Sequence, residues 1–187
     1  LVGLGNPGSN YTNTRHNIGF KIIDAINSHF KLSKQKPKFK GLLTTGNIDE
    51  KKIYAIKPLT FMNNSGTAIK ELIDYFKIDA KDVIVFHDDM DIDFGKVKAK
   101  FGGTSAGHNG IESIDKFIGK DYSRVRIGIG HPKQKKKVNN HVLEDFKEDE
   151  EEKIKEITEN IVKQIPTLID KKIDLFSSKV NQNLNGI

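Results

Sequence analysis

The sequence predicts an α/β protein in which a mixed β-sheet is flanked by helices, giving a single three-layer domain. Short apolar runs typical of strands alternate along the chain with segments whose apolar residues recur at helical spacing. A chain of 187 residues is long enough for one domain with a substantial core. Because no internal repeat or linker divides the chain, we expect residues 1–187 to form one domain.

The composition excludes several kinds of site and favours an anionic partner. Hydrophobic residues make up 36% and charged residues 30%, as in globular proteins. The absence of cysteine excludes disulfides and thiolate metal sites, and no apolar run is long enough for a membrane span. Residues 1–140 carry 24 basic and 14 acidic side chains, a net charge of +10, whereas residues 141–187 carry 7 and 11, a net charge of −4. Such a field favours nucleic acid, although a lysine-rich proteome explains the composition equally well.

The amino-terminal stretch predicts a strand, a tight turn and a helix. Leu1–Leu4 is an apolar run typical of a buried strand, and since it begins without an initiator methionine we expect a few residues to precede it. The glycines and proline of residues 5–8 predict a rigid turn, and a helix should run from about residue 14 to 30. His16 should then lie in the first helical turn, beside the strand end that carries Asn6.

Residues 3–8 match the G-x-G-x-x-G fingerprint of dinucleotide-binding proteins, but the match lacks its required context. That fingerprint opens a helix at its third glycine and is followed by an acidic residue at the end of the next strand. Here residues 9–12 delay the helix, and the nearest acid, Asp24, lies inside the helical pattern. We therefore expect no nucleotide at this turn.

The remaining elements continue the alternation of strands and helices. Apolar patterns predict strands at residues 39–48, 51–57, 82–86, 96–101 and 124–130. Helical spacing predicts helices at residues 66–76, 111–118, 149–163 and 167–177. The segments expected to be loops are 34–38, 59–64, 102–110 and the basic run 133–137.

Polar side chains recur where the predicted strands end: Asn6, His16, Asn63, Asp88 and Asn109. The carboxyl ends of strands are where open α/β proteins place their active sites. A histidine acts as a general base near neutral pH, a carboxylate can orient it, and amides can bind a peptide group or an oxyanion. Since there is no cysteine and no G-x-S-x-G motif, these groups predict direct attack by an activated water.

These residues also have purely structural interpretations. His16 could cap a helix at the surface, and Asn6 and Asn63 could simply form turns. The run His87–Asp91 could bind a metal, but the spacing fails the EF-hand pattern because Lys100 occupies the position that requires glutamate. We therefore expect no metal.

A series of motifs occurs in a fixed order along the chain: GLGNPG, YTNTRHNIGF, KPLTFMNNSG, VFHDDMD, GGTSAGHNG and RVRIGIGHP. Together they closely resemble the bacterial peptidyl-tRNA hydrolases, and the resemblance runs over the whole chain. It implies a mixed sheet flanked by helices in one domain. It also implies hydrolysis of the ester that joins a peptide to the terminal ribose of tRNA, which recycles stalled peptidyl-tRNA, and it implies that no cofactor is used.

The resemblance assigns roles to particular residues. His16 resembles the catalytic base, Asp88 resembles its carboxylate partner, and the amides that orient substrate and water are Asn6, Asn63 and Asn109. The positions that resemble the family's substrate cleft are Tyr11, Met62 and His108, and those that resemble its tRNA phosphate contacts are Lys98, Lys100 and Arg126. One departure is the loop 103–107, where many relatives are richer in glycine and often carry a histidine. This departure bears on the mobility of the loop and the width of the cleft rather than on the chemistry.

Two other classes of function remain open. One is a tRNA-binding module without catalysis, against which the intact His16, Asp88 and three asparagines argue. The other is a metal-dependent hydrolase built on the aspartates near Asp88, which would lose its activity in EDTA. We expect a peptidyl-tRNA hydrolase without cofactor or metal, acting on a nucleic-acid substrate as a cytoplasmic monomer that does not bind a membrane.

Overall fold

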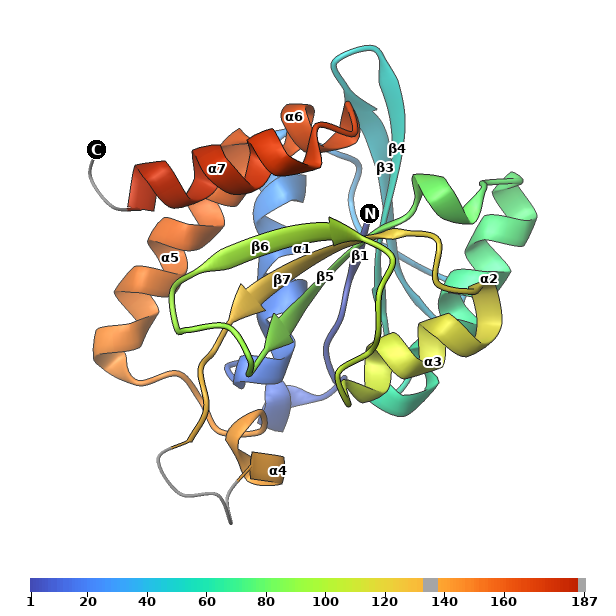
Figure 1. Cartoon of the computed structure of the whole chain (residues 1–187). Coiled ribbons are helices and arrows are strands. Elements are labelled where there is room, and N and C mark those ends of the chain that lie inside the picture. Colours follow the sequence, from blue (N-terminus) through green and yellow to red (C-terminus); the bar gives the residue numbers. More distant parts are fainter. Residues whose placement is uncertain (133–137, 185–187) are drawn as a thin grey trace.

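The computed structural model describes residues 1–132 and 138–184, and in this part of the chain the strands form one seven-stranded sheet (Figure 1). The strands are β1 (Val2–Gly3), β2 (Lys36–Lys38), β3 (Gly41–Ile48), β4 (Lys51–Pro58), β5 (Ile84–Asp89), β6 (Val97–Phe101) and β7 (Ser123–Gly128). Their order across the sheet is β2-β3-β4-β1-β5-β7-β6. The central strands β4, β1, β5 and β7 run parallel, whereas β2, β3 and β6 pair antiparallel.

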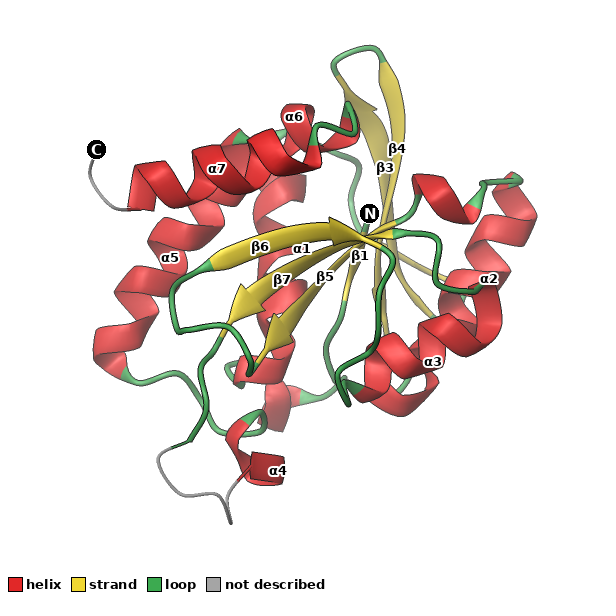
Figure 2. Ribbon diagram, viewed as in Figure 1, coloured by secondary structure: helices red, strands yellow, loops and turns green. Residues whose placement is uncertain are grey.

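Helices cover both faces of the sheet, so the fold has three layers (Figure 2). On one face lie α1 (Ile18–His29), α5 (Glu148–Lys163), α6 (Ile165–Ile169) and α7 (Ile173–Leu184). On the other face lie α2 (Ser65–Phe76) and α3 (Asn109–Ile118). Shorter helices are α4 (Val138–His141) and the 3₁₀ turns η1 (Ser9–Tyr11), η2 (Arg15–Asn17), η3 (Met62–Asn64) and η4 (Ala80–Asp82). The predicted fold class, a mixed sheet flanked by helices, is confirmed.

Each face of the sheet has its own hydrophobic core. Along β5, Ile84 and Phe86 face the core that α1, α5 and α7 cover, whereas Val85 faces the core beneath α2 and α3. A continuous apolar run is therefore what this central strand requires, because both of its faces are buried. No helix among the described residues is long and apolar enough to cross a membrane.

Two glycines let α1 lie directly on the sheet. A Cβ at Gly19 would come within 2.3 Å of the backbone nitrogen of Leu4 and within 2.5 Å of the carbonyl oxygen of Phe86. A Cβ at Gly3 would come within 2.2 Å of the carbonyl oxygen of Gly19. Only glycine fits at such a close approach. This contact fixes the start of α1, and with it the residues just before the helix, against the ends of β1 and β5.

The edge strand β6 is covered by side chains of α7. Asn181 accepts a hydrogen bond from the backbone N–H of Val97 at 3.0 Å and donates one to the carbonyl of Val97 at 2.7 Å. The hydroxyl of Ser177 accepts from the N–H of Ala99 at 2.9 Å. These bonds satisfy backbone groups that an uncovered edge strand would leave open to pairing with another chain.

Three predicted elements differ from the structure. The segment 34–38 is not only a loop, because β2 forms there as a short edge strand that includes Pro37, a residue tolerated at sheet edges. The strand predicted at 82–86 continues to Asp89, since β5 pairs with β7 over its whole length. The single helix predicted at 167–177 is wrong: Lys171, with φ of +63°, ends α6, and α7 starts afresh and runs to Leu184. The basic run 133–137 lies outside the described residues.

Candidate active site

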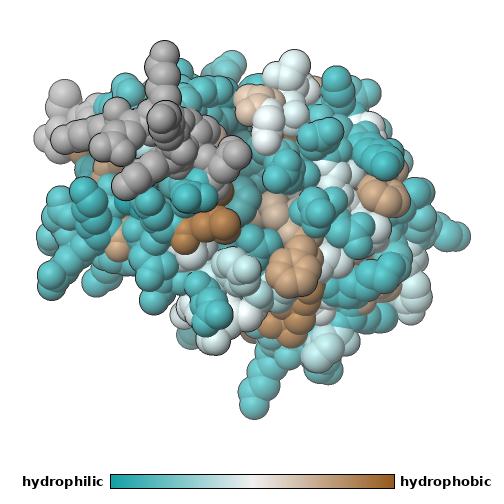
Figure 3. Space-filling view, turned by 90° about the horizontal axis from the view of Figure 1, so that it is seen from below, coloured by the Kyte–Doolittle hydropathy of each residue, from teal (hydrophilic) through white to brown (hydrophobic). Residues whose placement is uncertain are grey.

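A cluster of buried polar side chains lies at the carboxyl end of β5. Asp88 comes from the strand itself, His16 from η2 just before α1, and His108 from the residue that precedes α3. Together with Asn109 and Val142 they line a pocket of about 170 Å³. The face of the molecule seen from below in Figure 1, toward which β5 points, is mainly hydrophilic with hydrophobic side chains near its middle (Figure 3). The structure therefore brings together predicted site residues from three separate segments of the chain: His16, Asp88, and the adjacent pair His108 and Asn109.

One carboxylate oxygen joins the two histidines. Nδ1 of His16 lies 2.8 Å and Nε2 of His108 lies 3.0 Å from Oδ1 of Asp88. The two imidazole rings are 4.8 Å apart, measured between their centroids. The His16 and His108 side chains are each 9% exposed, and that of Asp88 is 2% exposed. Such a nearly dry cluster strengthens hydrogen bonds and makes an unpaired charge costly.

The charges of this cluster shift its pKa values. Burial alone would lower the pKa of His16, but the charge of Asp88 and its hydrogen bond together outweigh burial and raise that pKa above its ordinary value. Burial opposes ionisation of Asp88, yet the two histidines and their hydrogen bonds hold the pKa of its carboxyl well below the usual range. Asp88 is therefore ionised, and its negative charge favours the protonated form of His16.

The backbone that carries His16 is held by the segment that leads into α5. The N–H of His16 donates to the carbonyl of Val142 at 2.8 Å, and the N–H of Arg15 donates to that of Glu144 at 3.0 Å. The Arg15 side chain, only 3% exposed as a residue, donates to the carbonyl of Asp145 at 2.6 Å and pairs with Glu150 at 2.6 Å. Nothing in the sequence pattern marks Arg15 as a buried residue, because burial of an arginine next to a histidine leaves no periodic signal.

Asn6 is not among the residues that line this pocket. Its side-chain oxygen accepts a hydrogen bond from the backbone N–H of Met62 at 2.8 Å. Its own backbone exchanges two hydrogen bonds with the Asn17 side chain, at 2.8 and 3.0 Å. Asn6 therefore ties the Gly-Pro turn to η2 and η3, and it lines a neighbouring pocket.

The other amides and cleft residues differ in their exposure. Met62 is buried, and its sulfur lies so close to Gly110 that a Cβ there would approach it to 2.5 Å. Asn63 is exposed on η3 beside it, and Asn109 is exposed at the first turn of α3. Tyr11 is half-buried at the end of η1 and is not among the residues that line the His16 pocket.

The expected phosphate contacts form a cationic strip on β6 and β7. Lys98 lies opposite Arg126 and Lys100 lies opposite Arg124 in the antiparallel pairing. Burial, followed by the charges of Arg126 and Arg124, lowers the pKa of Lys100. An anion placed here would relieve that repulsion. Arg124 is buried and pairs with Asp115 at 2.8 Å, so its guanidinium is a structural part of the strip.

Comparison with known proteins identifies the family. A sequence model of the peptidyl-tRNA hydrolase family matches residues 1–186. This chain belongs to the peptidyl-tRNA hydrolase family. It is 73% identical over 181 residues to the peptidyl-tRNA hydrolase of Pelagibacter ubique, with 97% of each chain covered. It is 45% identical over 184 residues to that of Ehrlichia canis, covering 98% of this chain and 94% of the relative. The crystal structure of the peptidyl-tRNA hydrolase from Acinetobacter baumannii matches with a TM-score of 0.90 at 33% identity, covering 96% of this chain and 92% of that one.

In this member of the peptidyl-tRNA hydrolase family, His16, Asp88 and His108 also form a group of three possible metal ligands, with ligand atoms within 4.8 Å of one another. The donor set does not fit a divalent ion. Nδ1 of His108 accepts the backbone N–H groups of Gly110 and Ile111 at 3.1 and 3.3 Å. The proton of the neutral ring is then on Nε2, so the nitrogen that faces Asp88 has no lone pair to offer a metal.

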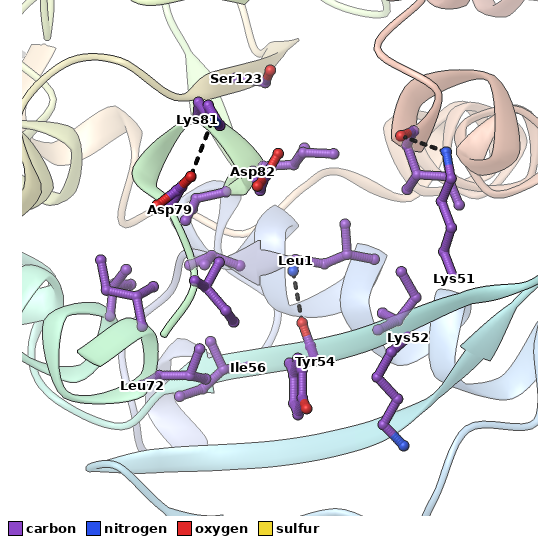
Figure 4. Close-up of a pocket in the computed structure, with 18 of the residues that line it drawn as sticks. Leu1, Lys51, Lys52, Tyr54, Ile56, Leu72, Asp79, Lys81, Asp82 and Ser123 are labelled. Atoms are coloured by element: carbon purple, nitrogen blue, oxygen red, sulfur yellow. Dashed lines mark hydrogen bonds and ion pairs between the residues drawn. The ribbon is translucent and has the colours of Figure 1, made fainter. Parts of the chain in front are cut away.

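A larger cavity of about 520 Å³ lies at the opposite, amino end of the parallel strands (Figure 4). Its walls are mainly apolar, with Ile56 and Leu72 among them, and Lys81 at its rim pairs with Asp79 at 3.0 Å. Volume alone does not mark an active site. The smaller pocket around His16 holds the convergent titratable groups, and we take it as the candidate active site of this peptidyl-tRNA hydrolase family member.

Proposed function

We propose that this chain hydrolyses the ester bond between a peptide, or another N-blocked aminoacyl group, and the terminal ribose of tRNA. Membership of the peptidyl-tRNA hydrolase family supports the substrate. The observation that carries the chemistry is the buried pair of His16 and Asp88, 2.8 Å apart in a pocket at the carboxyl edge of the sheet. A histidine oriented by a carboxylate is the arrangement that general-base catalysis needs.

The proton transfers follow from the hydrogen bonds. With Asp88 ionised, Nδ1–H of His16 donates to its Oδ1, which leaves Nε2 as the basic nitrogen. Nε2 takes a proton from a water as its oxygen attacks the ester carbonyl carbon. When the tetrahedral intermediate collapses, the bond to the ribose oxygen breaks and His16 returns the proton to that oxygen. The products are tRNA and a free peptide carboxylic acid, which releases its proton to solvent to become the carboxylate. The negative Asp88 stabilises the imidazolium that forms in between.

The amides and the buried methionine are proposed to bind the acyl part of the substrate. Asn109 lines the same pocket as His16 and can donate to the developing oxyanion or to a peptide carbonyl. Asn63 is exposed on η3 and can bond a peptide group of the substrate that lies further from the ester. Asn6 works through Met62, whose backbone it holds, and so shapes the wall of the cleft.

The cationic strip is proposed to bind tRNA phosphate. Lys98 and Lys100 stand on β6, next to β7, whose carboxyl end adjoins the pocket. Arg126 bonds Asp89 through Nε at 2.7 Å, so part of its charge is already neutralised, and we assign the lysines the larger share of phosphate binding.

The test is single-turnover release of the blocked amino acid from N-acetyl-aminoacyl-tRNA. The wild-type protein should release it and should keep its activity in EDTA, whereas His16→Ala should bind the tRNA without cleaving it. Binding without release by the wild-type protein would favour the tRNA-binding module, and loss of activity in EDTA would favour the metal-dependent hydrolase. Unblocked aminoacyl-tRNA should be a poor substrate, because its ammonium would enter a site whose three carboxylates already have partners. Asp88 bonds two histidines, Asp89 pairs with Arg126 and Asp91 pairs with His131.

We also propose that residues 1–187 act as one domain, as a monomer in the cytoplasm, where translation supplies the substrate. One sheet that carries both cores supports the single domain. Sedimentation equilibrium with and without tRNA tests the monomer, and a stable dimer would contradict it.

A further inference from the structure

The contacts of His108 give it a role different from the substrate contact that the sequence suggested. Its ring makes hydrogen bonds at both nitrogens, and neither bond goes to the open side of the pocket. Nδ1 accepts from the first N–H groups of α3, those of Gly110 and Ile111, and Nε2 bonds Oδ1 of Asp88 at 3.0 Å. His108 is thus the N-cap of α3 and a second donor to the carboxylate of Asp88.

We propose that His108 is a positioning residue that acts on His16 through Asp88. The backbone of α3 fixes the tautomer: because Nδ1 faces two N–H donors, the ring proton must lie on Nε2, where it points at Asp88. His108 therefore presents its Nε2–H to Oδ1 of Asp88, at a position that its bonds to the first turn of α3 fix. His16 shares the same oxygen, so the position of its ring depends on how firmly His108 holds that carboxylate.

This arrangement has two consequences for the proposed reaction. The bond from His108 withdraws negative charge from Oδ1, so that Asp88 raises the basicity of His16 less than a carboxylate with one partner would. It also prevents rotation of Asp88 away from His16, because a rotated carboxylate would leave the N–H of His108 unpaired in a nearly dry cluster. The catalytic part of this inference rests on the proposed function, whereas the tautomer and the basicity of His16 do not.

Other charged groups near the pocket stay the same when only His108 is changed. Asp89 and Asp91 line the pocket, and Asp89 is paired with Arg126. The ring of His87 meets that of His108 edge to face, with centroids 4.8 Å apart. The rings of His16 and His108 also lie 4.8 Å apart, so a change in the titration of His16 on substitution of His108 reports the lost bond to Asp88 together with the lost ring contact.

The first measurement uses the unchanged protein and needs no activity. Imidazole ¹⁵N chemical shifts should show neutral His108 with its proton on Nε2 and neutral His16 with its proton on Nδ1. A proton on Nδ1 of His108 would overturn the proposal, whatever the enzyme acts on.

The second measurement compares His108→Asn with the wild-type protein. Asparagine is a good N-cap, so α3 keeps its first turn, but the shorter side chain cannot bond the helix and Asp88 together. The pKa of His16, followed by NMR, should rise by about 0.5 to 1 unit, because Asp88 then has one donor fewer. In a plot of the single-turnover rate against pH, the rise on the acid side should move to higher pH by the same amount. The rate at the plateau should fall by about three- to tenfold.

The outcomes separate the possible roles of His108. An unchanged titration of His16 with an effect confined to KM would mean that His108 only contacts substrate, and the proposal would be overturned. If the wild-type protein does not hydrolyse N-acetyl-aminoacyl-tRNA, the proposed function fails, yet a raised pKa of His16 in His108→Asn would still support the positioning role. His108→Ala, which loses the cap as well, measures the contribution of the helix to folding by thermal unfolding.

Discussion

Asp88 is the residue on which the site depends, because a single buried oxygen accepts hydrogen bonds from two imidazoles. A carboxylate on a side chain that is 2% exposed would be costly if it had no donors, and two nearby N–H groups offset that cost. The site is thus preorganised before any substrate binds: His16 has one nitrogen committed and one left for water. Residues that share one hydrogen-bonded unit in this way should not act independently.

We expect His16 and Asp88 to behave as one catalytic unit. His16→Ala should lose at least about 10²-fold in single-turnover rate, the effect typical of a positioned base, and Asp88→Asn should lose less because the base remains. The double variant should be hardly slower than His16→Ala, since members of one unit are not additive. Circular dichroism checks that all four proteins are folded. Losses that multiply fully would mean that Asp88 acts elsewhere, for example on the ribose.

His87, next to Asp88, should make the fold sensitive to acid. It is buried, its Nδ1 donates to the carbonyl of Asp88 at 2.7 Å, and Nε2 has no partner. Burial, followed by the positive charge that His108 carries when it is protonated, lowers the pKa of His87 well below its ordinary value. The folded ring stays neutral while the unfolded ring takes up a proton below pH of about 6.5, so stability is fully present above that pH and falls as the pH drops through it.

The test of His87 is urea unfolding between pH 7 and 5. His87→Asn keeps an N–H donor near the Asp88 carbonyl and removes the titrating group, so its free energy of unfolding should fall less steeply, by up to about 1.4 kcal/mol per pH unit. His29→Asn, at an exposed position on α1, is the control for loss of an imidazole. Equal slopes for His87→Asn and the wild-type protein would show that His87 does not contribute.

At the scale of elements, hydrogen bonds between the ends of separate segments hold the site together. η2 carries His16, and its backbone is paired with the segment between Val142 and Asp145. Glu150, in the first turn of α5, accepts both from Arg15 and from the backbone N–H of Lys147. One guanidinium therefore connects the turn that bears the base to the start of a helix far along the chain.

Arg15→Lys should weaken this connection, because an ammonium cannot reproduce the planar fork that reaches two carbonyls and a carboxylate. We expect a loss of about 1–3 kcal/mol in stability and a fall of about tenfold or more in single-turnover rate, with little change in KM. The matched control is Lys21→Gln, which removes the more exposed ion pair to Glu151 at the same helix interface. A stability loss without any change in rate would show that Arg15 serves the fold alone.

At the scale of the whole molecule, the cationic side chains and the proposed catalytic groups lie on neighbouring parts of one sheet. The net charge of +10 on residues 1–140 creates the field that attracts a polyanion, and the acidic residues 141–187 include α5 and α7 on the opposite face from α2 and α3. Cations on β6 continue toward the pocket at the carboxyl end of β5 and β7. This arrangement suits a substrate that has a long anionic part to contact the cations and one reactive ester to enter the pocket.

Lys100→Ala should reduce both the affinity for tRNA and its dependence on salt. One lost phosphate contact lowers the slope of log K against log salt concentration by about 0.7–0.9. Lys52→Ala is the matched control, because it removes one exposed lysine at the opposite end of the sheet. If both variants change the slope equally, only net charge matters and Lys100 makes no specific contact.

Much of the fold could be read from the sequence because it depends on local patterns. The apolar run before Asp88 predicts a strand buried on both faces, and the spacing in α1 predicts its apolar stripe. The Gly-Pro turn places Asn6 and His16 near each other in the chain, and the order of the motifs indicates the family. In strongly periodic elements, neighbouring residues are enough to show whether the segment is a helix or a strand and which of its faces is buried.

Other features depended on contacts between distant segments, which leave no periodic signal. Lys171 divides the last helix in two, because α7 must turn to cover the edge of β6. The side-chain oxygen of Asn6, a residue expected among the catalytic groups, accepts the backbone N–H of Met62, a contact that the local sequence does not indicate. His108 bonds Asp88 and caps α3, and Arg15 is buried against Glu150, only because the tertiary structure brings these groups within hydrogen-bond distance. The sequence by itself determined the elements and the kinds of catalytic group, whereas packing between distant segments decided which nitrogen of each histidine faces Asp88 and that both nitrogens bond the same oxygen.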